Sequence, residues 1–219
     1  GLVEYAEPNI RFQTTFTPDD VYWDRQWNLQ KIKADWAWNT TIGSHSVLVA
    51  VVDTGIDYNH PDLAANYAPF GYDWVNNDTD PIDDHGHGTH CAGIIAGVTN
   101  NHEGIAGIAQ VRIMAEKGLS NEGVGYTDQL VQAIIDAADK GADIISMSWG
   151  SYAHSELMHE AIKYAYDSGV LLVAAAGNLV LTLKSFPAGY DEVVAVAATD
   201  ENDKLAWFSN FGEWIELSA

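Results

Sequence analysis

The amino-acid sequence predicts an α/β fold in which helices cover both faces of a mostly parallel central sheet, giving three layers. Apolar runs of strand length alternate along the chain with segments whose apolar residues recur at helical spacing, as in βαβ units. The first clear run, residues 47–52, is apolar at every position, which is typical of a strand buried on both faces of a parallel sheet. With 219 residues, of which 47% are hydrophobic, the chain can form one sizeable core.

The expected elements follow one another along the chain. Residues 3–9 alternate like a strand that Pro8 and Asn9 terminate, and tryptophans within residues 27–38 recur at a loose helical spacing. After the run at 47–52 we expect strands at residues 111–115, 143–147, 170–175 and 193–197, and helices at residues 93–97, 128–139 and 156–167. Such alternation predicts right-handed crossovers between parallel strands.

Charge and composition exclude several classes of partner. The chain has 31 acidic and 10 basic residues, a formal net charge of −21 that would repel a phosphate backbone, so we expect no nucleic acid. The acids are mostly aspartate, which suits coordination of hard cations, an extracellular surface or a saline habitat. The sequence has no run of eighteen apolar residues, so we expect no membrane partner. Cys91 is the single cysteine, which excludes a disulfide within the chain.

Three histidines, His85, His87 and His90, lie within six residues and precede a run of small apolar residues. Glycines between them allow a tight turn and a close approach to a ligand, so we expect at least one histidine at the first turn of a buried helix. A solvated turn before a core helix is the structural alternative. The spacing H-x-H-x-x-H also occurs in binuclear metal hydrolases, but Thr89 stands where their zinc sites usually have an aspartate.

Polar residues also follow two of the apolar runs directly. Asp53 comes after residues 47–52, and Asn178 comes shortly after residues 170–175. The carboxyl ends of parallel strands are where open α/β sheets place their chemistry. A structural alternative for Asp53 is the capping of the next turn.

In this order and spacing, these segments resemble the subtilisin-like serine proteases, most closely the thermitase branch. The similarity is carried by VAVVDTGIDYNHPDL (49–63), HGTHCAGI (87–94), VTNNHEGIAGIA (98–109) and VLLVAAAGN (170–178). It extends from about residue 16 to the last residue. The resemblance implies a three-layer subtilisin-like fold with its C-terminal part missing.

The resemblance assigns catalytic roles to three residues. Asp53 is the implied orienting carboxylate, His87 the general base, and Asn178 the side-chain donor to the oxyanion. The family's nucleophile lies in a Gly-Thr-Ser-Met-Ala motif that this sequence lacks. We therefore expect the serine beyond residue 219, and we expect this chain alone to be inactive. Cys91, at the place that thermitase-like enzymes also give to cysteine, is expected beside His87 without acting as a nucleophile.

The resemblance also divides the chain into two parts. Residues 1–15 are the expected end of an inhibitory propeptide, and residues 16–219 are the expected catalytic domain, incomplete at its C-terminus. The chain would then come from a zymogen. An ordinary N-terminal extension is the alternative for the first part.

Two segments are expected to bind an extended peptide by β-addition. The resemblance implies an exposed edge strand and a facing strand, formed by Gly123, Val124 and Gly125 and by Ser148, Trp149 and Gly150. Trp149 replaces the usual leucine between the first and fourth substrate pockets, and Tyr126 is expected at the border of the fourth. We expect an apolar or aromatic residue before the scissile bond. Trp149 as an ordinary core residue is the alternative.

Calcium is the expected cofactor, because two sets of oxygen-bearing residues match thermitase-type sites. The first set is Asp20, Asp62, Val98, Asn101, Glu103 and Ile105. The second, expected to be more exposed to solvent, is Asp73, Asn76, Asp78 and Asp80. Residues 73–84 as a plain acidic surface loop are the alternative to the second site.

Two departures from the family bear on the pockets. Residues 115–118, Ala-Glu-Lys-Gly, put charge at a strand end where burial is expected, and residues 179–183 are unusually apolar for a loop.

The function that the resemblance implies is that of a secreted, calcium-dependent serine endopeptidase acting on polypeptides as a monomer, with its own propeptide as inhibitor. The alternative is a catalytically dead calcium-binding module, a pseudoprotease.

Overall fold

The computed structural model describes residues 7–8 and 16–219, so the strand and the propeptide end predicted within residues 1–15 lie outside the described residues except for Glu7 and Pro8. In the described part, seven strands form one sheet in the order β2-β3-β1-β4-β5-β6-β7, and neighbouring strands are parallel throughout. The strands are β1 (Leu48–Asp53), β2 (Tyr72–Asp73), β3 (Arg112–Lys117), β4 (Ile144–Met147), β5 (Leu171–Ala175), β6 (Val193–Ala197) and β7 (Leu217–Ser218).

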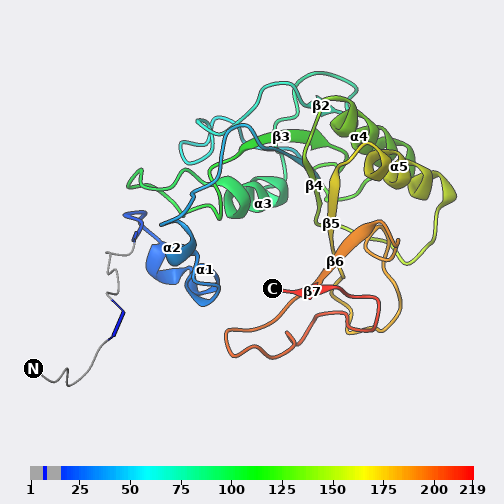
Figure 1. The fold of residues 1–219 in the computed structure, drawn as a ribbon. Helices are drawn as coiled ribbons and strands as arrows, with labels where there is room; N and C mark the ends of the chain where they lie inside the picture. Colours follow the sequence, from blue (N-terminus) through cyan, green and yellow to red (C-terminus); the bar gives the residue numbers. More distant parts are fainter. Residues whose placement is uncertain (1–6, 9–15) are drawn as a thin grey trace, which may run out of the picture.

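The two faces of this sheet are covered by α3 (His87–Ala96), α4 (Thr127–Asp139) and α5 (Glu156–Asp167). The 3-10 helix η1 (Trp23–Arg25), α1 (Trp27–Lys31) and α2 (Ala34–Ala37) pack in a separate small core. Figure 1 shows α4 and α5 side by side on one face and α3 on the other. The predicted three-layer, mostly parallel architecture is confirmed.

Strand β1 lies inside the sheet, between β3 and β4, and separates two cores. All six of its residues are buried. Because successive side chains of a strand point to opposite faces, Ala50 and Val52 pack into the core under α4 and α5, whereas Val49 and Val51 pack into the core under α3. Burial of each valine stabilises the fold by about 1.5 to 3 kcal/mol, so both cores fix the position of the strand end that carries Asp53.

The strand β3 is longer than the predicted run at residues 111–115. It continues through Glu116 and Lys117, which are 0% and 1% exposed although both bear charged groups. Their backbones pair with β1 on one side and β2 on the other. Neighbouring strands on both sides thus extend an element whose sequence looks unsuitable for burial.

One expectation about local structure is wrong. Residues 123–125 and 148–150, predicted as strands, belong to no strand of the described chain; Gly123 has a left-handed φ of 71°. The helical spacing predicted within residues 27–38 is confirmed by α1 and α2, although Trp27 and Trp36 are exposed. The aromatic cluster there instead joins Trp38 to Trp23 and to Phe16.

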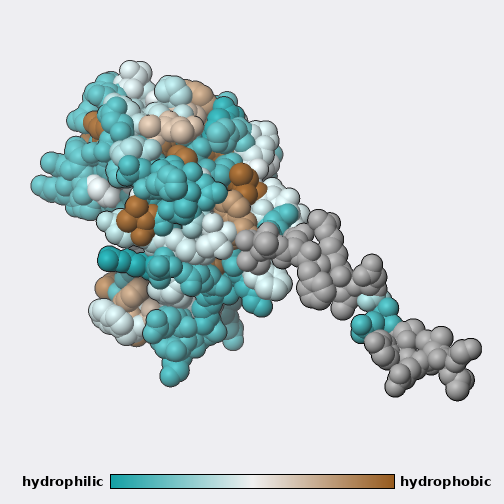
Figure 2. Space-filling model, turned by 90° about the vertical axis from the view of Figure 1, so that its left-hand side faces the viewer, coloured by the Kyte–Doolittle hydropathy of each residue, from teal (hydrophilic) through white to brown (hydrophobic). Residues whose placement is uncertain are grey.

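The surface reflects the excess of acidic residues. Figure 2 shows a mostly hydrophilic face interrupted by small hydrophobic patches. Among the described residues, no helix combines the length and the apolar character needed to cross a lipid bilayer.

Candidate active site

The centre of the candidate site is a pair formed by Asp53 and His87. Asp53 ends β1 and is completely buried, and its Oδ1 lies 2.7 Å from Nδ1 of His87 and accepts a hydrogen bond from the Thr54 N–H at 2.8 Å. The His87 side chain is 44% exposed. A carboxylate on Nδ1 keeps the proton on that nitrogen and leaves Nε2 free to accept another. The two predicted catalytic residues are therefore brought together in the geometry of a general base with its orienting acid.

Glycine allows the close approach of α3 to β1. A Cβ atom on Gly88 would lie 2.1 Å from the carbonyl oxygen of Gly55, so no larger residue fits there without displacing backbone. The Gly88 N–H donates to Oγ1 of Thr54 at 2.9 Å, which ties the first turn of α3 to the residue after Asp53. His87 is the first residue of α3, as expected, but the helix begins six residues before the predicted 93–97.

Asp83 is a positioning residue that the sequence analysis missed. Its carboxylate accepts hydrogen bonds from the N–H groups of His85 (2.9 Å), Gly86 (2.8 Å) and Thr89 (2.9 Å), and from the Thr54 hydroxyl (2.8 Å). Burial raises the pKa of Asp83, but these hydrogen bonds outweigh it and hold the pKa below its ordinary value. The side chain thereby caps the start of α3. The signal that could have identified Asp83 from the sequence is the position of an acidic residue a few residues before a helix.

Lys117 adds a second link between the same loops. Its buried ammonium donates to the carbonyl of Thr54 at 2.7 Å and forms an ion pair with Asp84. Since Thr54 follows Asp53 and Asp84 precedes α3, the lysine joins the two chain segments that carry Asp53 and His87. The charge noted as a departure at this strand end is therefore neutralised locally.

The strand register places the predicted third element at the same edge of the sheet. Ser146 on β4 pairs with Val51 on β1 and with Val173 on β5, so the carboxyl ends of these three strands lie side by side. Asn178 follows β5 and is exposed. Its side chain makes no hydrogen bond within the described part of the chain, which leaves the amide available as a donor.

Asn210 shapes the loop that carries Asn178, and the sequence analysis missed it too. Its buried amide donates to the carbonyl of Ala176 at 2.8 Å and accepts from the N–H groups of Leu179 and Leu181 at 3.1 and 3.0 Å. These bonds bracket Asn178 on both sides.

The other residues of the histidine-rich stretch have different surroundings. The Sγ of Cys91 lies 4.0 Å from Nδ1 of His87, and burial raises the pKa of the thiol to about 11, so Cys91 is a thiol near neutral pH, as predicted. The rings of His85 and His87 are 6.3 Å apart. In the described residues, neither His85 nor His90 joins a cluster able to hold a metal, which gives the binuclear-hydrolase alternative no support.

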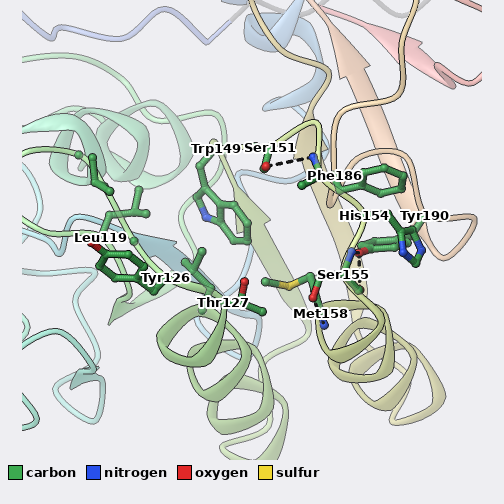
Figure 3. A pocket seen from close by; sticks show the side chains of 16 residues that line it. Leu119, Tyr126, Thr127, Trp149, Ser151, His154, Ser155, Met158, Phe186 and Tyr190 are labelled. Carbon is green, nitrogen blue, oxygen red and sulfur yellow. Dashed lines mark hydrogen bonds between the residues drawn. The ribbon is translucent and has the colours of Figure 1, made fainter.

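A pocket of about 490 Å³ lies between the starts of α4 and α5 (Figure 3). Six of the seven predicted substrate-binding residues line it: Gly123, Val124, Gly125, Tyr126, Trp149 and Gly150. Ser148 does not. Trp149 packs against the core and also faces the pocket, and its Nε1 donates to the carbonyl of Val52 at 2.8 Å. Trp149 is thus both a core contact and a pocket wall.

The first predicted calcium set is gathered in one place. Asp62 and Asp20 are both buried, and Asp62 accepts hydrogen bonds from the Asn101 amide at 2.8 Å and from the Ile105 N–H at 2.9 Å. Oδ2 of Asp20 accepts from the Asn100 N–H at 3.0 Å, whereas Oδ1 is buried without any hydrogen-bond partner. Burial raises the pKa of Asp20.

The other members of this set close the loop around Asp62. Val98 donates its N–H to the Asp62 carbonyl at 2.8 Å, and Glu103 donates its N–H to Oδ1 of Asn101 at 2.9 Å. A buried carboxylate oxygen that has no hydrogen-bond partner would be satisfied by a bound cation. The groups in this set that could coordinate a cation are oxygens, and the Asn101 amide can rotate so that its oxygen points toward the ion. These residues therefore fit Ca²⁺.

In the second predicted calcium set, more of the polar groups have hydrogen-bond partners within the set. Asp73 is buried, contrary to the expected exposure, and accepts from the N–H groups of Val75 and Asn76 at 2.8 Å and from the Asn76 amide at 2.9 Å. Asn76, Asp78 and Asp80 are exposed as predicted, and Asp80 accepts from the Tyr58 hydroxyl at 2.5 Å.

Comparison with known proteins identifies the family. The sequence profile of the Subtilase family matches residues 44–219. The chain is 46% identical over 220 residues to the thermophilic serine proteinase of Bacillus sp. (strain AK1), which covers 100% of this chain and 55% of that protein. It is 44% identical to thermitase of Thermoactinomyces vulgaris, covering 93% of this chain and 73% of thermitase. It is 43% identical to the halolysin-like extracellular serine protease Nep of Natrialba magadii, covering 99% of this chain and 41% of that protein.

A solved structure agrees with the fold. A protease from Pseudoalteromonas arctica superposes with a TM-score of 0.84 at 32% identity, covering 93% of this chain and 72% of that one. The chain spans about half the length of the first curated relatives that it matches. The family profile, the sequence identities and the Asp53–His87 pair agree, and the chain belongs to the Subtilase family, in its thermitase branch.

Proposed function

We propose that the protein to which this chain belongs is a serine endopeptidase that hydrolyses peptide bonds of polypeptides. The observation that carries the proposal is the 2.7 Å contact between the buried Asp53 carboxylate and Nδ1 of the half-exposed His87. The serine nucleophile would be supplied by residues after 219. The relatives named as serine proteases support the same activity.

In the proposed reaction, Nε2 of His87 takes the proton of the serine hydroxyl as that oxygen attacks the substrate carbonyl. Asp53 stabilises the imidazolium that forms, and His87 then gives the proton to the leaving amine. Asn178 donates its side-chain N–H to the developing oxyanion, a contact whose removal typically lowers kcat by about 10²- to 10³-fold in an example drawn from this same family. The loop bonds of Asn210 hold that donor in place.

An extended substrate would lie between residues 123–125 and 148–150, neither of which belongs to a strand of the sheet. The N–H of Gly123 and the carbonyl of Val124 are hydrogen-bonded to Ser120, so the main-chain groups that could pair with a bound chain are those of Gly125 and of residues 148–150. The pocket beside them is lined largely by apolar and aromatic side chains, Trp149 and Met158 among them, which favours an apolar or aromatic substrate residue there.

Calcium would stabilise the folded enzyme. The first set would hold it through Asp20, Asp62, the Asn101 side chain and backbone carbonyls of residues 98, 103 and 105, and the second set through Asp73, Asn76, Asp78 and Asp80. A bound cation would neutralise the Asp20 and Asp62 carboxylates and join the segment at residue 20 to the loop at 98–105. We therefore expect chelation with EGTA to lower the thermal midpoint of unfolding, and Asp20→Ala to remove most of that response.

We also propose that the enzyme is secreted and monomeric and is made as a zymogen inhibited by its propeptide. The excess of acidic residues and the relative whose name describes it as extracellular support secretion.

The activity is tested on the full-length protein. We expect covalent labelling by a serine-directed fluorophosphonate and hydrolysis of a protein substrate, with turnover reduced by about 10⁴-fold or more in His87→Ala. His90→Ala, an exposed histidine on the same helix, is the matched control and should keep its turnover. A full-length protein that binds Ca²⁺ but takes no label would instead be the pseudoprotease module.

A further inference from the structure

A second group of side chains that could hold a metal ion lies beside the pocket, and one of them, His154, lines it. His154 precedes α5, Glu156 is the first residue of that helix, and His159 lies one turn further on. Each offers a ligand atom, and these three atoms all lie within 4.8 Å of one another. Glu156 and His159 are three residues apart in a helix, a spacing that places both side chains on one face.

The two histidines are held by their surroundings. The His159 ring is stacked on Tyr190 at a centroid distance of 4.4 Å and an angle of 10°, and its Nε2 lies 3.0 Å from the carboxylate of Glu192. The His154 ring meets Phe186 edge to face at 5.1 Å. A carboxylate beside a ligating histidine fixes the ring and raises its basicity, and sites that lose such a partner bind metal more weakly.

The Tyr190 side chain, which is stacked on the His159 ring, also connects its own segment to the start of α5. Its hydroxyl donates to the Ser155 carbonyl at 2.8 Å, and Ser155 caps α5 by accepting from the Met158 N–H at 3.2 Å. The segment that carries both histidines, at the start of α5, is thus hydrogen-bonded to residues 186–192, which supply the contacts of the two rings. Figure 3 shows His154 and Tyr190 together at the edge of the pocket.

We propose that His154, Glu156 and His159 bind a borderline transition-metal cation such as Zn²⁺ at the edge of the substrate pocket, with Glu192 orienting the His159 ring. Two imidazole nitrogens and a carboxylate are the donors that Zn²⁺ prefers, whereas Ca²⁺ takes oxygen ligands only. The site is therefore distinct in chemistry from the two calcium sets, and it does not depend on protease activity.

Metal binding would have a structural consequence. A cation shared by the start of α5 and the segment before it would hold His154 against Phe186, and both of these line the pocket. Because the ion would bind the folded chain and not the unfolded one, it would raise the thermal midpoint, and the rise would grow with the logarithm of its concentration above the Kd.

The test is a titration of the Ca²⁺-saturated full-length protein with Zn²⁺, followed by calorimetry and by the thermal midpoint. The protein should carry Cys91→Ala, because Asp53, His87 and Cys91 form the other cluster able to hold a metal in the described residues. We expect one Zn²⁺ per molecule and a rise in midpoint. In His154→Gln and His159→Gln the affinity should fall by about 10-fold or more. His90→Gln is the matched control, and its affinity should not change.

Two further measurements keep the proposal open to refutation if a histidine variant fails to fold. Glu156→Gln alters a side chain that is 82% exposed, so it should fold and still weaken Zn²⁺ binding. Co²⁺ bound to the Cys91→Ala protein should show weak visible bands, and His154→Gln and His159→Gln should lose them. The proposal is wrong if Zn²⁺ binds equally well to the His154, Glu156 and His159 variants, if none binds, or if the Co²⁺ bands are unchanged in the histidine variants.

Discussion

Two buried carboxylates lie on neighbouring strands of the sheet, Asp53 at the end of β1 and Glu116 near the end of β3, and both are 0% exposed. Asp53 faces His87, whose ring reaches solvent. Glu116 points into the core under α4, where it accepts from the indole of Trp74 at 2.8 Å and from the ammonium of Lys140 at 3.3 Å. The two carboxylates are therefore equally buried, but the side chain that Asp53 contacts is more exposed to solvent than those that Glu116 contacts.

The difference shows that burial alone does not make an acid catalytic. Desolvation raises the pKa of Glu116 to about 8, and the nearby charge of Asp136 adds to this effect. Lys140 only partly compensates, because its ammonium is shared with Asp136. An acid at a sheet end becomes useful when its partner also offers a nitrogen that can accept a proton, as the His87 ring does; the groups that bond to Glu116 are an indole and an ammonium, which only donate.

The largest expected effect separates the two acids by turnover. In the full-length protein, Asp53→Asn should lower kcat by about 10⁴-fold, because an amide cannot hold His87 in the required tautomer. The matched variant Glu116→Gln should retain its turnover, since that side chain lies away from the pocket and from His87. Steady-state kinetics on both variants decide this, and an active Asp53→Asn enzyme would place the orienting acid elsewhere.

The next effect separates them by pH. A carboxyl group whose pKa is raised in the folded state stabilises the fold below its unfolded pKa, here 4.5, and that contribution is lost as pH rises through about 8. Wild type should therefore lose on the order of 3 kcal/mol of unfolding free energy between those values relative to Glu116→Gln.

Denaturant unfolding at several pH values measures this loss. Glu122→Gln, at an exposed position, is the control and should follow the wild-type curve. Parallel curves for wild type and Glu116→Gln would mean that folding does not shift the pKa of Glu116.

The smallest expected effect concerns Asp83, an acid that has hydrogen-bond donors on both oxygens. Asp83→Ala should lower the unfolding free energy by about 1 to 2 kcal/mol near neutral pH, because α3 loses its cap. The pKa of Asp83 is lowered in the folded state, so its contribution is present above the ordinary value of 3.8 and is lost as pH falls below it. Calorimetry at neutral and acid pH tests this, with Asp128→Ala, in the exposed first turn of α4, as control.

Much of the fold is predictable from the sequence. The strand at residues 193–197 and the helix at 156–167 have the predicted bounds, because their apolar spacing and their flanking residues agree. Strand β3 is longer than predicted because pairing with two neighbours, which no local pattern records, extends it over Glu116 and Lys117. Residues 123–125 lack the expected strand, since that pairing needs a second chain.

The residues of the candidate site likewise divide into those that the sequence predicts and those that it does not. Asp53 and His87 are predictable because each follows from a short motif, whereas the roles of Asp83, Lys117 and Asn210 depend on contacts between segments distant in sequence. The cluster of His154 and His159 is likewise visible only once the chain is folded, because Tyr190 and Glu192 come from another segment.

The indole N–H of Trp149 donates a hydrogen bond to the carbonyl of Val52, the residue immediately before Asp53. Replacing Trp149 with a smaller residue, in order to admit different substrate side chains, would also remove the hydrogen bond to that carbonyl and loosen the strand end that carries Asp53. The substrate preference and the rate of hydrolysis would then change together. Redesign should begin at Leu130 or Met158, whose side chains line the same pocket and are wholly apolar or nearly so.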